Sequence, residues 1–232
     1  MMTVLRRLLV AALIAGGVSG ALLGIAQVGF ITPLILEAET HEHRDPAQNE
    51  SAHHAWEPKD GLERNAYTVL FTTLAGIGFA LILNAGMLLR RETGVRRGLI
   101  WGAAGFVVFS LAPALGLPPE LPGAHAADLL ARQTWWTGTV LATATGLACI
   151  VFSRRPWART IGVIALVLPH VIGPPPGIAP GNPALAGLER EFIATSLLIM
   201  LGFWLVVGVL SGILHRRFLA SDDRASGVAH AA

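Results

Sequence analysis

Cysteine and charge are both scarce in this 232-residue chain, and each scarcity excludes a class of protein. Cys149 is the only cysteine, so an intrachain disulfide and a cysteine-based metal cluster are both excluded. Charged residues make up 14% of the chain, against about 25% in a typical soluble globular protein. Because 53% of the residues are hydrophobic and the mean hydropathy is +0.59, the composition indicates an integral membrane protein.

The motifs of several chemistries are also missing. No GxxxxGK[ST] loop is present, which argues against P-loop ATP hydrolysis, and no HExxH pair supports a zincin-type protease. No charged side chain lies deep within a long apolar stretch, which removes the usual residues of a proton relay. The net charge of +2 does not indicate a nucleic-acid partner. We therefore predict that the protein is not an enzyme and has neither catalytic residues nor a resident cofactor.

Six apolar stretches dominate the sequence and predict an all-α integral membrane protein. The predicted spans are 8–36, 66–89, 98–117, 133–152, 157–176 and 191–214. The first follows a basic start, as a signal peptide does, but its length favours an uncleaved helix. The fifth has only about 14 uninterrupted apolar residues near 160–173, so five crossings are the alternative to six. We predict one polytopic membrane domain over 1–218 and a polar C-terminal tail over 219–232.

Small residues recur every fourth position along the first predicted span. They are Ala12, Gly16, Gly20 and Gly24, and we call them the small-residue stripe. Small side chains allow two membrane helices to approach closely. The stripe therefore predicts a helix-packing surface.

The basic residues alternate along the chain in the pattern of the positive-inside rule. All except Lys59 are arginine. Clusters of arginine lie before the first span, between the second and third, between the fourth and fifth, and after the sixth. This pattern predicts six crossings with both termini in the cytoplasm. If the fifth stretch did not cross, the arginines after the sixth would face outward.

Histidines and carboxylates that could bind a metal gather on the side predicted to face outward. The segment 37–64 is a polar loop rich in acidic residues and histidines. A second polar segment covers Pro118–Trp136, and a Pro-His pair lies near the outer end of the fifth span. Imidazole and carboxylate ligands suit divalent first-row ions such as Zn, Ni or Co. The candidate metal ligands are His41, His43, His53, His54, Glu120, His125, Asp128 and His170.

Each candidate also has a simpler interpretation, which the sequence leaves open. The loop histidines can be solvated side chains. If a helix begins near Ala124, His125, Asp128 and Arg132 share one face, and Asp128 can pair with Arg132 instead of a metal. His170 follows a proline, which frees a backbone carbonyl, but it can equally be a packing histidine.

The remaining polar residues give little indication of a path through the membrane. Trp135 and Trp136 are interpreted first as interfacial anchors. The inner halves of the spans offer only Asn84, Cys149, threonine and serine hydroxyls and a few methionines. The sequence therefore indicates capture on the outer side more clearly than passage inward.

Two motifs resemble those of a known family. PPELPG followed by DLLARQTWW lies within Pro118–Trp136, and LPHVIGPPP covers Leu168–Pro176. With the first helix and the acidic, histidine-bearing loop after it, they resemble the predicted cobalt transporter subunit family CbtA, over nearly the whole chain to about Phe218. The residues carried over by position are Glu120, Asp128, Arg132, Gln133, Trp135, Trp136, Pro169 and His170.

The resemblance implies uptake of cobalt, tied to cobalamin synthesis, beside a very small single-helix membrane subunit with a His-rich tail. We therefore predict a permease subunit in the lipid bilayer of the bacterial inner membrane that takes up a divalent transition-metal cation, most favourably cobalt. His125, Asp128 and His170 are predicted to form the first defined site, with Arg132 orienting Asp128. The alternative is a metal-binding scaffold or accessory subunit without transport activity. A membrane enzyme with a hydrolytic metal centre has no motif to support it.

Overall fold

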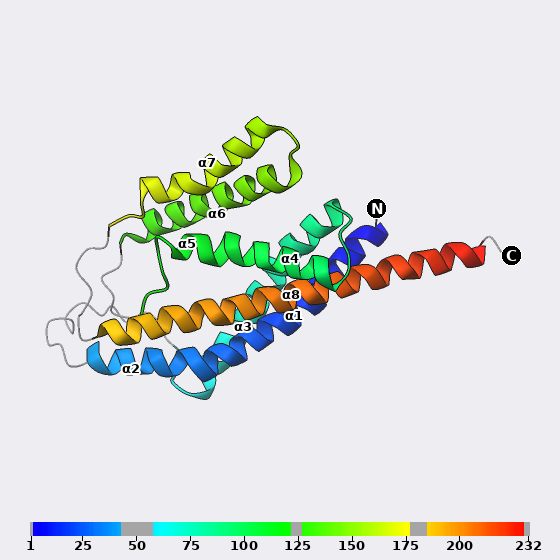
Figure 1. The fold of residues 1–232 in the computed structure, drawn as a ribbon. Helices are drawn as coiled ribbons and strands as arrows, with labels where there is room; N and C mark the ends of the chain where they lie inside the picture. The colour runs from blue at the N-terminus through cyan, green and yellow to red at the C-terminus, as the bar shows by residue number, and fades with distance from the viewer. Residues whose placement is uncertain (1, 43–57, 122–126, 177–184, 230–232) are drawn as a thin grey trace. The chain divides into compact units, whose positions relative to one another are not determined.

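The computed structural model describes residues 2–42, 58–121, 127–176 and 185–229 (Figure 1). These residues are mostly helical and contain no strand. Five of their helical segments are long and apolar enough to cross a membrane. The segments are Leu5–Thr40, Leu62–Leu89, Val95–Ala114, Leu129–Phe152 and Ala186–Phe218. The prediction of an all-α, multi-pass membrane protein is confirmed, whereas most of the histidine-rich loop lies outside the described residues.

The fifth predicted span corresponds to a shorter helix, α7 (Pro156–Ile172). It is apolar but has only 17 residues. At 1.5 Å per residue it is about 26 Å long, slightly less than the ~30 Å hydrocarbon core of a bilayer. It begins at a proline, which is favourable because N–H groups in the first turn have no acceptor within the helix and proline lacks this group. It ends at Gly173, whose φ of 82° lies in the left-handed region that glycine adopts readily.

The chain folds into two compact units. Unit 1 comprises Met1–Phe30, Trp56–Gly105 and Leu198–Ala232, and unit 2 comprises Ile31–Ala55 and Phe106–Leu197. Helix α8 (Ala186–Ala229) contributes residues to both and continues through most of the predicted polar tail. The single polytopic domain over 1–218 stays a prediction.

In unit 1, α1 (Met2–Ala26) packs along α3 (Leu62–Leu89), and the small-residue stripe lies at their contact. A Cβ atom added to Gly16 would lie 2.5 Å from the Cα atom of Ile77. One added to Gly20 would lie 2.6 Å from the carbonyl oxygen of Thr72. Only residues without side chains permit this approach, so the prediction that the stripe packs against another helix is confirmed.

A buried polar pair joins α3 to α8 within unit 1. Asn84 and Ser211 are both fully buried. The side-chain N–H groups of Asn84 donate to the carbonyl oxygen of Ala80 at 2.7 Å and to the Ser211 hydroxyl oxygen at 3.0 Å. Hydrogen bonds between membrane helices stabilise their packing by about 0.6 kcal/mol on average. The pair therefore stabilises the contact between these faces of α3 and α8.

We expect Ser211→Ala to lower the free energy of unfolding by about 0.6–1.7 kcal/mol, because Asn84 loses its partner on the other helix. The same substitution made in an Asn84→Leu background is expected to have a smaller effect, since no hydrogen bond is then lost. Unfolding in mixed detergent measures the free energy of the unchanged protein, the two single variants and the double variant. Equal effects of Ser211→Ala in both backgrounds would contradict the role of the pair.

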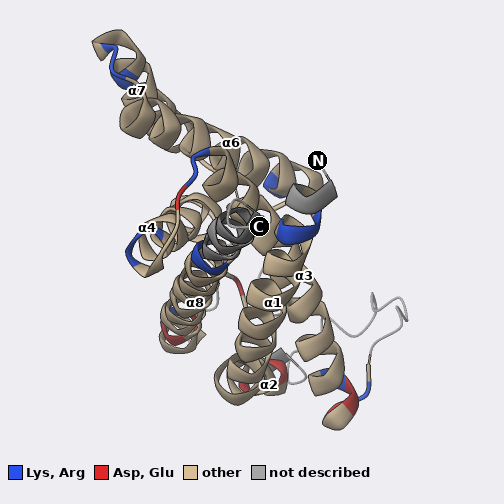
Figure 2. Cartoon of the chain, turned by 90° about the vertical axis from the view of Figure 1, so that its right-hand side faces the viewer, with Lys and Arg blue, Asp and Glu red and all other residues tan. Residues whose placement is uncertain are grey.

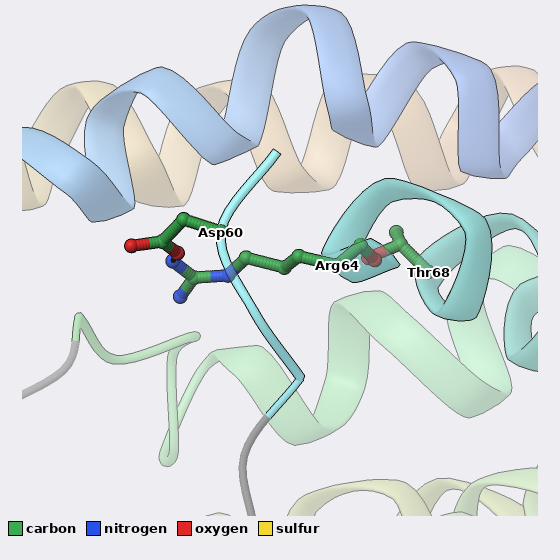
Figure 3. A network of polar contacts seen from close by, with 3 residues as sticks. All are labelled: Asp60, Arg64 and Thr68. Carbon is green, nitrogen blue, oxygen red and sulfur yellow. Dashed lines mark hydrogen bonds and ion pairs between the residues drawn. The ribbon is translucent and has the colours of Figure 1, made fainter. Parts of the chain in front are cut away.

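The helices on either side of the histidine-rich loop extend beyond the predicted spans. α2 (Thr32–Glu42) continues the first helix six residues past position 36, because Glu and Ala favour helix and no breaker intervenes. α3 begins before position 66, at Leu62. There Arg64 pairs with Asp60 at 2.9 Å, and the Thr68 hydroxyl donates to the carbonyl oxygen of Arg64 at 2.9 Å (Figure 3). These contacts stabilise the first turn of α3.

Two short π-helical segments interrupt the apolar helices. η1 (Gln27–Ile31) precedes Pro33, and η2 (Val107–Leu111) precedes Pro113, which lies in the short helix α5 (Ala112–Ala114). Proline has no N–H to donate to the carbonyl four residues earlier, and its ring clashes with that carbonyl. In both cases that carbonyl belongs to the π-helical segment, so widening the helix there relieves the clash.

In unit 2, α6 (Leu129–Phe152) and α7 form a helix pair (Figure 1). Gly146 and Gly162 face each other in this contact. A Cβ atom added to either glycine would lie 2.7 Å from the carbonyl oxygen of the other. The backbones of α6 and α7 therefore approach closely, which positions the residues at the Asp128 end of α6 beside the C-terminal turn of α7.

Charged side chains lie mostly near the helix ends, although α8 carries Arg216 and Arg217 within its length (Figure 2). Arginines occupy the first turns of α4 (Val95–Phe106) and α7, whereas acidic residues occur at the end of α2 and the start of α3. Because an unpaired charge in hydrocarbon is costly, this distribution is typical of membrane-spanning helices.

Candidate functional site

The candidate site lies in unit 2, where α6 begins. Asp128 is the N-cap of this helix, and its Oδ1 atom accepts a hydrogen bond from the backbone N–H of Ala131 at 3.0 Å. The helix thus begins at Leu129 and not near Ala124, because an aspartate N-cap satisfies a free backbone N–H at this position. His125 lies outside the described residues, so the predicted common face with Asp128 stays a prediction.

Arg132 pairs with Glu120 instead of Asp128. One Nη atom of Arg132 lies 2.7 Å from a carboxylate oxygen of Glu120, and both side chains are about one-third exposed. The expected orienting of Asp128 by Arg132 is therefore not observed. Glu120 balances the positive charge of Arg132, and Asp128 forms no ion pair with a basic side chain among the described residues.

Asp128 faces an open hollow of about 510 Å³ at this end of α6. The hollow is lined by Asp128, Leu130, Ala131, Thr134, Trp135 and Pro175. Its lining combines one carboxylate, one hydroxyl and an indole with apolar side chains. Pro175 follows α7 and belongs to the motif Leu168–Pro176, whereas the other lining residues belong to Pro118–Trp136. Residues of both motifs therefore line one hollow.

Trp135 connects this hollow to His170. Its indole ring lies edge-on to the imidazole of His170, with ring centroids 6.2 Å apart and an interplanar angle of 70°. On another side, a Cβ atom added to Gly116 would touch the same indole. The Nε1 atom of Trp135 is buried and has no hydrogen-bond partner among the described residues. The indole therefore holds a free N–H donor close to the candidate site.

Most of the chain matches a known protein family. The family described as probable cobalt transporter subunit (CbtA) matches residues 5–216 of the chain. This chain belongs to that family. Comparison with curated proteins and with solved structures gives no match.

For this CbtA member, two of the predicted ligands have Trp135 as a common neighbour. Asp128 and His170 both adjoin Trp135, one across the hollow and the other through a ring contact. Glu120 is occupied by Arg132. Three candidate ligands in the histidine-rich loop, His43, His53 and His54, lie outside the described residues, and His41 is described only as part of α2. Their contact with a metal stays a prediction.

The described residues of this CbtA chain contain no cluster of three histidine, cysteine or acidic side chains positioned to hold a metal ion. One carboxylate and one imidazole near a hollow can make only a partial coordination shell. Such a pair can hold a divalent cation that keeps several of its water molecules, and carboxylate with imidazole suits first-row ions. This arrangement fits transient capture better than permanent storage.

Trp135 is the residue whose role sequence reasoning missed. Its position at the start of a span made it an expected interfacial anchor. The structure adds that its ring contacts Gly116 and His170, while Trp136 packs near Phe109 with ring centroids 6.4 Å apart. Adjacent helical residues point about 100° apart, so the two tryptophans must meet different neighbours. Only the fold shows which neighbours these are.

Proposed function

We propose that this CbtA family member takes up a divalent transition-metal cation, with cobalt as the preferred ion, and captures it at Asp128 and His170. The observation that carries the proposal is that both side chains adjoin Trp135 beside the hollow at the start of α6. The pairing of Arg132 with Glu120 supports it further. That ion pair reduces the repulsion that a free guanidinium would exert on an incoming cation.

In this proposal the hollow opens to the outside of the bacterial inner membrane. The alternation of arginine clusters along the chain supports six crossings with both termini in the cytoplasm. Helix α7 is then the fifth crossing, and its length of about 26 Å is sufficient if the bilayer thins slightly or flanking residues reach the interface. Asp128 and His170 lie at the ends of α6 and α7 that are away from Arg154 and Arg155.

The acidic, histidine-rich loop is proposed to raise the local concentration of the cation before capture. Eight acidic side chains between Glu37 and Arg64 against three basic ones give it a negative charge. Negative charge near a binding site attracts cations and raises the rate of association. His41, His43, His53, His54 and His125 are proposed to take part in transient binding on this side.

We further propose that the chain works with a second membrane subunit. The family description as a transporter subunit supports a partner. A small single-helix protein with a His-rich tail is the partner that the family resemblance implies. It would present additional imidazole ligands, which would complete the partial coordination shell offered by one carboxylate and one imidazole.

Measurement of cobalt uptake tests this function directly. Cells that lack other high-affinity cobalt uptake are expected to accumulate more cobalt when they produce this chain with its small partner than when they produce the partner alone. Accumulation is measured by elemental analysis of washed cells after short exposure to low cobalt concentrations. Nickel and zinc, measured in parallel, establish which cation is preferred.

Two results would oppose the proposal. Equal cobalt content with and without the chain would show that the chain does not transport. If the purified chain nevertheless bound cobalt, the scaffold or accessory role would replace the transport role.

A further inference from the structure

The face of α6 that starts at the candidate site continues inward with two buried threonines. Trp135, Thr139 and Thr143 are spaced four residues apart, so they lie on one side of the helix. Thr139 is 0% exposed and Thr143 is 1% exposed. Thr143 is 14 residues after Leu129, or about 21 Å along the helix, which places it beyond the midpoint of α6.

The two threonines differ in what their hydroxyl groups contact. The Thr139 hydroxyl donates to the carbonyl oxygen of Trp135 at 2.9 Å, as a threonine in a helix usually does. The Thr143 hydroxyl is buried and has no hydrogen-bond partner among the described residues. A buried hydroxyl without a partner in an apolar interior is unfavourable, so a ligand that supplies one is bound favourably.

Helix α7 presents a second polar group at the same level. Pro169 is buried in α7 and has no N–H, so the carbonyl oxygen of Ala165 lacks the donor that a helix normally supplies four residues later. Trp135 contacts His170, and a Cβ atom added to Gly146 would lie 2.7 Å from the carbonyl oxygen of Gly162. Between these two contacts, the antiparallel register places Ala165 beside the part of α6 that carries both threonines.

We propose that the hydroxyl groups of Thr139 and Thr143 and the carbonyl oxygen of Ala165 form an inner site for the transported divalent cation. The inference rests on the proposed function, because it supplies the step after capture at Asp128 and His170. All three ligand groups are neutral oxygens. They can accept hydrogen bonds from the water molecules that a cation retains, or replace some of those waters as ligands.

The absence of charge at this inner site is suited to passage. A site on a transport path must bind the ion strongly enough to accept it and weakly enough to release it. A buried carboxylate would hold a divalent cation tightly, whereas hydroxyl and carbonyl oxygens bind it weakly. The close contact of Gly146 with Gly162 lies three residues beyond Thr143 along α6.

Substitution of Thr143 by valine tests the inner site, because valine keeps the shape and removes the hydroxyl. We expect Thr143→Val to lower the rate of cobalt uptake about tenfold, the factor that corresponds to loss of one hydrogen-bond-sized interaction. Thr143→Ser, which restores a hydroxyl, is expected to retain most uptake. Thr145→Val is the matched control, since Thr145 lies two residues further along α6 and is exposed. Uptake is normalised to the amount of protein in the membrane.

Equilibrium binding of Co²⁺ to the purified chain separates the inner site from the capture site. Thr143→Val is expected to keep the Co²⁺ affinity of the unchanged chain, because Asp128 and His170 remain. Pro169→Ala restores an N–H for Ala165 and is expected to lower uptake as well. Full uptake by Pro169→Ala would show that the carbonyl oxygen of Ala165 is not a ligand, and it would overturn the three-oxygen site.

The controls make the outcomes distinguishable. Equal uptake by Thr143→Val and Thr145→Val, with uptake by the unchanged chain established, would overturn the inner site and leave the proposed function intact. An equal loss in Thr143→Val and Thr143→Ser would also overturn it, because the hydroxyl would then not be the important group. Absence of uptake by the unchanged chain would instead refute the proposed function.

Discussion

The Asp128→Asn, His170→Ala double variant is expected to lose nearly all cobalt accumulation that depends on this chain. Substituting even a residue that only supports a metal ligand commonly lowers metal affinity about 10- to 100-fold. Loss of two direct ligands is therefore expected to lower cobalt affinity by at least about 100-fold. The measurement is cobalt accumulation at several external concentrations, together with Co²⁺ binding to the purified variant.

These substitutions are chosen so that the fold is retained. Asparagine is as good an N-cap as aspartate, so α6 still begins at Leu129. His170 is exposed, and its replacement by alanine leaves no buried cavity. Asp60→Asn is the control for a general loss of negative charge, because Asp60 is paired with Arg64 and is not among the residues that line the hollow. Retained accumulation in the double variant would show that Asp128 and His170 are not the capture site.

Gly16→Val is expected to have the largest effect on stability. Its first side-chain carbon would lie 2.5 Å from the Cα atom of Ile77 and 2.6 Å from the carbonyl oxygen of Gly76. Both atoms belong to the backbone of α3, so the two helices must separate. Overpacking typically costs about 1–3 kcal/mol, and a clash with backbone is expected at or above the upper end of that range.

Gly17→Val is the matched control for Gly16→Val. A Cβ atom at Gly17 would meet nothing within 4 Å. Valine favours the helix slightly more than glycine does at either position, so the difference between the variants reports packing alone. Thermal unfolding in detergent measures both proteins. Equal midpoints would contradict the close packing of α1 on α3.

The apolar helices were predictable because their signal is local. A long run of apolar residues must form a helix in a bilayer, where no water can satisfy the backbone. The small-residue stripe was likewise readable, since spacing of four residues defines one face of a helix before its partner is known. Helix ends were less predictable. Asp128 sets the start of α6 through one side-chain hydrogen bond, and α2 continues to Glu42 because no helix-breaking residue intervenes.

The candidate site was only partly predictable for the same reason. The sequence marked Asp128, Arg132 and His170 as unusual, but spacing on one helix favoured an Asp128–Arg132 pair. The structure pairs Arg132 with Glu120, which precedes the helix, and brings Trp135 against His170 from α7. Neither contact follows a helical repeat. Both depend on how a loop and a second helix return to α6.

The sequence by itself determined that this is a helical membrane protein of the CbtA family, because apolar length and ordered motifs are properties of consecutive residues. Tertiary structure decided which polar groups have partners. Arg132 and Glu120 neutralise each other, whereas Thr143 and the indole N–H of Trp135 are buried without a hydrogen bond among the described residues. Whether a polar group finds a hydrogen-bond partner on another segment is decided only when the helices pack.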